Sequence, residues 1–277
     1  SATFRGENRR FGARQAAYLP EVAKDNKKKL RIDYQNDAGD TLYTQYVKVK
    51  EAGMVNWRWA MWEKGTYYPE FKVRDEKKEQ NDRRGAPVVP GTYKATMNWD
   101  GYTASRTIEV RQDYRMESWV SGDDLTARRD AFKSIEAIEV PLDKAVQALA
   151  QANENIERLQ ALLQREPYAS DTALTDTVKA TAKALEEVRL SIFGKKETKG
   201  YFEQPEVWSN QWGGSLWQLL SSYRAWESNE QALYAQLKER TEEATEAVYT
   251  FLEEDYKALL TYLQAHPVDL MVPTGVE

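Results

Sequence analysis

In the stretch from Val89 to Arg115, apolar and polar residues alternate on both sides of the dipeptide Asp100-Gly101. A period of two on either side of a two-residue Asp-Gly turn predicts a β-hairpin with a type I′ turn. Pairing Trp99 with Tyr102 across this turn places Met97 opposite Ala104 and Tyr93 opposite Ile108. The apolar positions that share one face are Tyr93, Ala95, Met97 and Trp99 in the first strand, and Tyr102, Ala104, Ile108 and Val110 in the second.

Three shorter alternating stretches precede the hairpin and predict further strands, at residues 30–34, 42–49 and 55–61. A hairpin with one apolar face needs a second sheet to cover it. We therefore expect an antiparallel Ig-like β-sandwich that ends at about residue 118. The charged stretches 24–29 and 74–84 are expected to be exposed loops.

From about Asp123 the apolar spacing changes to steps of three and four, which is typical of amphipathic helices. One stripe runs from Leu125 to Leu163, and Pro141 within it should kink or split the helix. A second runs from Leu174 to Ile192 and stops at Gly194.

The last long helix is expected to begin at the capping-box pair Ser228 and Gln231 and to end at His266-Pro267. A shorter helix, Ser215 to Trp226, is expected before it. The sequence thus predicts a two-domain α+β protein, with a β-sandwich at 1–118 and an antiparallel bundle of three long helices plus a short one at 119–277. The two domains are expected to fold separately.

The chain carries 44 acidic and 39 basic residues, for a net charge of −5, and the two kinds are interspersed. A nucleic-acid partner would favour a basic face, so none is expected. No run approaches the roughly 18 apolar residues of a membrane span. With no cysteine and one histidine, thiolate nucleophiles, disulfides, His-based triads and multi-His metal sites are excluded. His266 is interpreted as a solvated residue at a helix C-terminus.

Several motifs resemble one known family. Residues 5–19, RGENRRFGARQAAYL, resemble the opening "GeNPPfGA…YYL" of the C-terminal region of bacterial BNR-repeat proteins, which are sortilin-like or glycosyl-hydrolase-like propellers common in Bacteroidetes. Residues 30–39 resemble that region's strand and turn "l.I.D..G". Residues 53–57 resemble "GlNrv.WDlR", with Arg58 in place of the usual Asp. Residues 89–93 and 110–113 match "v.PGtYtVrl…ltVr.Dpr", with Tyr114 in place of Pro.

The resemblance covers nearly the whole chain, although its motifs are structural. It implies an extracytoplasmic β-sandwich and helical bundle, in the periplasm or at the cell surface, attached behind a β-propeller that this sequence lacks. The hydrolase activity would belong to the propeller, so no catalytic residue and no cofactor is carried over.

Two groups of aromatic residues are candidates for an interaction surface. Trp57 and Trp59 share a strand face with other apolar residues and are expected in the core. Trp62 falls on the opposite face. Together with Tyr67 and Tyr68 it forms the group that we expect to be exposed, as a candidate for binding a partner or a sugar ring.

The second group lies in the stretch 194–214, which is expected to be a long loop because glycine and proline interrupt it. Its aromatic residues can pack against a domain or offer a contact surface. One of the two tryptophans is expected in the core and the other at the surface. The four residues are Tyr201, Phe202, Trp208 and Trp212.

Asn36, Asp37 and Asp40 carry oxygen ligands suited to calcium, but ordinary turn chemistry explains them, so no metal site is expected. We expect a non-catalytic accessory or interaction module that positions a propeller or docks another extracytoplasmic protein. A carbohydrate-binding module is the alternative. A hydrolase is less favoured, because no pair of carboxylates is recognisable in the sequence.

Overall fold

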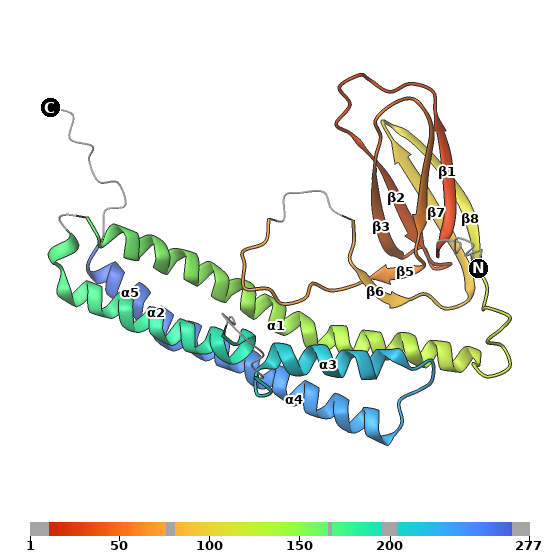
Figure 1. The fold of residues 1–277 in the computed structure, drawn as a ribbon. Helices are drawn as coiled ribbons and strands as arrows, with labels where there is room; N and C mark the ends of the chain where they lie inside the picture. The colour runs from red at the N-terminus through yellow and green to blue at the C-terminus, as the bar shows by residue number, and fades with distance from the viewer. Residues whose placement is uncertain (1–10, 76–80, 166–167, 196–203, 268–277) are drawn as a thin grey trace, which may run out of the picture. The chain divides into compact units, whose positions relative to one another are not determined.

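The structure is a computed structural model that describes residues 11–75, 81–165, 168–195 and 204–267 (Figure 1). The fold is α+β, as predicted, with antiparallel strands in the first half of the chain and long helices in the second. None of the described helices is long and apolar enough to cross a membrane.

The described strands form one four-stranded and two two-stranded antiparallel sheets. The large sheet has the order β3-β2-β7-β8, while β1 pairs with β4 and β5 with β6. Their bounds are Ala13–Leu19 for β1, Lys29–Gln35 for β2, Thr41–Lys48 for β3, Gly53–Trp59 for β4, Trp62–Lys64 for β5, Arg84–Pro87 for β6, Gly91–Trp99 for β7 and Tyr102–Val110 for β8.

The β7–β8 hairpin has the predicted register. Trp99 pairs with Tyr102, Met97 with Ala104 and Tyr93 with Ile108. Asp100 and Gly101 have φ angles of 45° and 87°, and two consecutive positive values are those of a type I′ turn. The predicted hairpin is therefore confirmed, including the residues that face each other.

The core of the strands lies between the large sheet and the β1–β4 pair. Leu30, Ile32 and Tyr34 of β2 are fully buried there. The Tyr34 ring stacks on Trp59 of β4 with 4.4 Å between ring centroids, and its hydroxyl accepts a 3.0 Å hydrogen bond from Trp57 Nε1. Burial raises the pKa of Tyr34. Trp57 and Trp59 are core residues, as predicted.

The helices are α1 (Gly122–Leu162), the 3₁₀ turn η1 (Tyr168–Ser170), α2 (Thr172–Phe193), α3 (Trp208–Ser221), α4 (Ser228–Phe251), the π-helical turn η2 (Leu252–Tyr256) and α5 (Lys257–Ala265). The last three follow one another without a break. Asp171 caps α2 by accepting a 2.9 Å hydrogen bond from Leu174 N–H, and α2 ends at Gly194 as predicted. His266 follows α5 directly, as expected, and its ring stacks on that of Tyr262.

Pro141 was expected to kink or split the first helix, and α1 continues past it without a split; a kink stays a prediction. Packing around it outweighs the single lost hydrogen bond, since Leu142 and Ala145 are fully buried. Two further expectations about the helices need correction. The cap of α4 lies one residue earlier than predicted, since Glu230 Oε2 accepts from the Glu227 N–H at 3.2 Å. The short helix begins at Trp208 and ends at Ser221, so the stretch 194–214 is not a loop throughout.

Contacts divide the chain into two compact units. The strand unit contains the described residues up to Thr66, those from 81 to 136, and Tyr223–Ala225. The helical unit contains Tyr67–Asp75 and the described residues from 137 to 222 and from 226 onward. A single boundary at residue 118 does not coincide with this division, and separate folding of the two parts stays a prediction.

Replacing Gly101 with Val should lower the free energy of unfolding by about 1 kcal/mol or more, because a β-branched residue strongly disfavours positive φ. The new side chain would meet no atom within 4 Å, so the cost is conformational alone. Gly213→Ala is the matched control: its Cβ is also unobstructed, but it lies within α3, so it should be neutral or stabilising. Equal effects of the two substitutions in urea denaturation would contradict the turn assignment.

Candidate functional site

Trp62, predicted to be exposed, is half-buried in the strand unit. Its ring meets the edge of Phe132 from α1, with 5.8 Å between centroids. Trp59 Nε1 donates a 3.1 Å hydrogen bond to the Trp62 carbonyl. This side chain therefore attaches the β5–β6 sheet to α1, and its ring already has a protein partner.

Tyr67 and Tyr68, the other two residues of that group, lie in a segment that belongs to the helical unit. We call this segment, Tyr67–Asp75, the strap. The Arg74 guanidinium lies 3.9 Å from the centre of the Tyr67 ring, and the Tyr68 ring lies 5.9 Å from that of Trp208 in α3. Burial, together with the charge of Glu139, raises the pKa of Tyr68. Both tyrosines are half-buried, and both rings already have protein partners.

Polar side chains of α1 hold the strap. Gln147 Nε2 donates to the carbonyls of Glu70 and Lys72, at 3.1 Å each, and its Oε1 accepts from Arg74 N–H at 3.0 Å. The Arg74 guanidinium forms a two-bond ion pair with Asp143, one bond being 3.1 Å, and this raises the pKa of Arg74. Nothing in the local sequence signals this arrangement, because the partners are about 70 residues apart.

Trp208 and Trp212 are one helical turn apart in α3 and both are buried, at 3% and 0% exposure. Their ring centroids are 4.9 Å apart. Trp208 Nε1 donates a 3.0 Å hydrogen bond to the buried Thr241 hydroxyl of α4, whereas Trp212 Nε1 has no partner among the described residues. Both tryptophans are thus core residues of the helical unit, and the expectation that one of them lies at the surface is wrong. Tyr201 and Phe202 lie outside the described residues.

The buried carboxylates of the strand unit are neutralised by cations. Glu63 of β5, with 7% of its side chain exposed, pairs with Arg129 and, at 3.2 Å, with Lys133. Lys133 also contacts Glu136 at 2.9 Å. Hydrogen bonding to Glu63 raises the pKa of Arg129. The cluster attaches β5 to the first turns of α1, and its arrangement is that of a structural ion-pair network.

The turn from Asn36 to Asp40 is held by its own hydrogen bonds. Asn36 Oδ1 accepts from Asp40 N–H at 2.8 Å, and Asn36 Nδ2 donates to Asp40 Oδ2 at 3.0 Å. One side-chain oxygen each of Asn36 and Asp40, which were considered as calcium ligands, is therefore used by the turn. Within the described part of the chain, no group of three or more acidic or histidine side chains could hold a metal ion.

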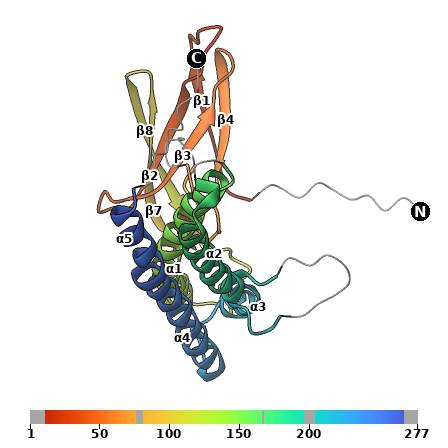
Figure 2. The ribbon, with the colours of Figure 1, turned by 90° about the vertical axis from the view of Figure 1, so that its left-hand side faces the viewer.

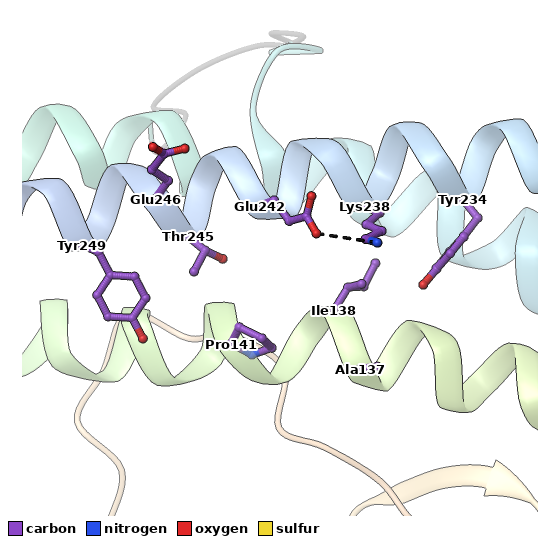
Figure 3. A pocket seen from close by; sticks show the side chains of 9 residues that line it. All are labelled: Ala137, Ile138, Pro141, Tyr234, Lys238, Glu242, Thr245, Glu246 and Tyr249. Atoms are coloured by element: carbon purple, nitrogen blue, oxygen red, sulfur yellow. Dashed lines mark ion pairs between the residues drawn. The ribbon is translucent and has the colours of Figure 1, made fainter.

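An open cleft of about 530 Å³ lies between α1 and α4 (Figure 3). Its α1 side is apolar, and its α4 side carries the ion pair of Lys238 and Glu242, with 3.8 Å between the charged atoms. The tyrosines lie toward its two ends. The lining residues are Ala137, Ile138, Pro141, Tyr234, Lys238, Glu242, Thr245, Glu246 and Tyr249.

A second exposed apolar site lies on the outer face of the β1–β4 sheet. Tyr18 and Met54 face each other across the two strands, and they are 67% and 62% exposed. The alternation of β1 turns Leu19 into the core and therefore turns Tyr18 outward. The sequence could have identified this pair only if the pairing of β1 with β4 had been known.

Comparison of the chain with protein-family models, curated proteins and solved structures finds no match.

The two core tryptophans should respond differently to replacement by Phe. Both substitutions remove similar ring volume, but Trp208→Phe also leaves the buried Thr241 hydroxyl without its donor. Trp212→Phe instead removes a buried donor that has no partner. Trp208→Phe should therefore be the more destabilising by about 1 kcal/mol or more in chemical denaturation. The reverse order would show that the hydrogen bond contributes nothing.

Removing the strap's ion pair should destabilise the helical unit. Arg74→Ala leaves Asp143 charged in a site where only 12% of its side chain is exposed, at a cost of roughly 3 kcal/mol. The double variant Arg74→Met/Asp143→Leu should recover much of this loss. Lys183→Ala is the control, because its partner Glu187 is exposed and the pair should contribute well under about 1 kcal/mol. Thermal unfolding of the full chain measures all three, and equal losses for Arg74→Ala and Lys183→Ala would contradict the role of the strap.

Proposed function

We propose that this chain is a non-catalytic interaction module that docks a partner protein through the outer face of the β1–β4 sheet. The observation that carries the proposal is the pair Tyr18 and Met54, two large side chains exposed directly opposite each other on paired strands. Aromatic residues and methionine are enriched in protein interfaces. The backbone of a paired strand is already ordered, so binding here requires no ordering of a loop.

The neighbouring residues of the same face give it a mixed character. Ala16 lies opposite Asn56, and Arg14 opposite Arg58, so small, polar and cationic side chains follow the apolar pair along the sheet. An apolar contact with a polar border is the usual composition of an interface between separate proteins. The exposed Arg14 favours a partner with an acidic residue beside an apolar depression.

The partner we propose is an extracytoplasmic β-propeller, or another protein of that compartment. The support is the resemblance of residues 5–19 and 89–93 to the region that follows the propeller in BNR-repeat proteins. The chain would then act in the periplasm or at the cell surface.

A protein partner is favoured over a glycan because of how the aromatic residues are used. A sugar-binding platform needs free ring faces, and Trp62, Tyr67 and Tyr68 each have a ring or a guanidinium beside them. The buried acids Glu63 and Asp143 are likewise held by cations. These contacts support structural roles for the residues that a carbohydrate-binding or hydrolytic function would use.

The absence of cysteine allows a site-specific test. A single cysteine placed by Tyr18→Cys, labelled with a benzophenone maleimide and irradiated in an extracytoplasmic extract of the source organism, should give an adduct with a propeller protein, identified by mass spectrometry. Tyr249→Cys in α4, where the native side chain is 44% exposed, is the matched control and should not give that adduct.

An identical set of adducts from both positions, or none from position 18, would contradict the proposed docking face. Titration of the unmodified chain with oligosaccharides, followed by tryptophan fluorescence, tests the alternative. A saturable change there would favour carbohydrate binding instead.

A further inference from the structure

The two edges of the four-stranded sheet differ. At the β3 edge, Thr44 N–H donates a 2.7 Å hydrogen bond to Asp82 Oδ2, and Tyr46 N–H donates to Asn81 Oδ1. Asp82 N–H also donates to the Thr44 carbonyl at 3.0 Å. The segment before β6 thus covers this edge and satisfies its backbone groups.

The β8 edge has no such cover. In the described part of the chain, β8 is the last strand of its sheet, with no neighbour beyond it (Figure 2). Seven successive residues, Gly101 to Thr107, are exposed, including Tyr102 at 76%. Uncovered edge strands readily pair with another strand, and proteins usually protect them with lysine, proline or a bulge. β8 contains none of these.

The hairpin geometry determines which backbone groups point outward. In a hairpin with a two-residue turn, the residues flanking the turn, Trp99 and Tyr102, form a hydrogen-bonded pair, and such pairs alternate along the ladder. The odd-numbered residues of β8 therefore direct their N–H and C=O groups away from β7. These residues are Thr103, Ser105, Thr107 and Glu109.

We propose that two copies of this chain associate through antiparallel pairing of β8 with β8, with Ser105 on the two-fold axis. In this register Thr103 of each copy lies opposite Thr107 of the other, and the outward-pointing backbone groups form about six hydrogen bonds, two for each hydrogen-bonded pair. Tyr102 lies opposite Ile108, so an aromatic ring meets a β-branched side chain on the same face.

Side-chain chemistry selects this register over its neighbours. An axis at Arg106 would place the two Arg106 side chains directly opposite each other, and like charges at such positions are destabilising. An axis at Thr107 would leave Tyr102 beyond the partner's strand. The axis at Ser105 covers Tyr102 and places no like charges directly opposite each other, whereas an axis at Ala104 or Thr103 would shorten the overlap of the two strands. A second copy is therefore the occupant that this edge fits.

The test places like or opposite charges across the proposed β8–β8 pairing and measures how strongly the dimer forms. Sedimentation velocity of the full chain over a range of concentrations should show a monomer–dimer equilibrium. Thr103→Lys/Thr107→Lys places lysine opposite lysine twice and should weaken the dimer by about tenfold or more. Thr103→Lys/Thr107→Glu places lysine opposite glutamate twice and should restore it. Within one strand these positions are four residues apart, roughly 13 Å, so the two introduced charges do not pair with each other inside a monomer. Position 107 also faces Lys94 of β7 in the same chain, so Thr107→Glu alone is the control: it keeps that internal contact but adds no lysine across the dimer, and it should not strengthen the dimer as the lysine–glutamate variant does.

Thr250→Lys/Thr261→Lys, at exposed positions of the last helices, adds the same charge and should leave the dimer unchanged. Circular dichroism checks that each variant is folded, and hydrogen exchange should show the amides of Thr103, Ser105 and Thr107 protected in the dimer alone. A wild-type chain that stays monomeric, or a dimer unaffected by the two lysines in β8, would overturn the proposal. Failure of the lysine–glutamate variant to recover the dimer would overturn the register.

Discussion

The strand unit depends on two consecutive residues with positive φ, Asp100 and Gly101. A type I′ turn fixes the register of β7 against β8, and in a strand a shift of one residue would exchange the buried and exposed faces. The observed register places Tyr93, Ala95 and Trp99 in the core. Among the described strands, β7 lies between β2 and β8, which leaves β8 at the edge of the sheet. The turn thereby determines which side chains of the hairpin the sandwich buries.

The helical unit includes a segment that lies between two strands in the sequence. The strap lies between β5 and β6 in the sequence but packs against α1, α2 and α3 through Gln147, Phe193 and Trp208. It also supplies the cation that neutralises Asp143. A buried carboxylate without that partner would be strongly unfavourable. Cutting the chain at residue 118 would separate the strap from the helices that it contacts. The loss would be greatest for α1, because Asp143 and Gln147 of this helix bind the strap.

The sequence was most informative where the pattern was regular and local. The hairpin register and the end of α2 at Gly194 could be predicted because alternation, turn residues and helix caps act over a few positions. The start of α3 could not, because Gly213 and Gly214 disfavour a helix. Burial of Trp208, Trp212 and Leu219 on one face overrides that preference. The strap was missed since its partners are distant in sequence.

Many aromatic side chains of this chain pack against other residues, so the few that are exposed need a separate explanation. Tyrosine, tryptophan and phenylalanine make up 12% of the chain, and those first considered as a binding surface pack against other side chains of their own unit where the structure describes them. A single exposed apolar residue is ordinary on any protein. Tyr18 with Met54, and Tyr102 on an open edge, differ because each lies on a paired strand beside further accessible surface. Exposed apolar groups that lie together favour association, which is why the two proposals place contacts with other chains at the sheets.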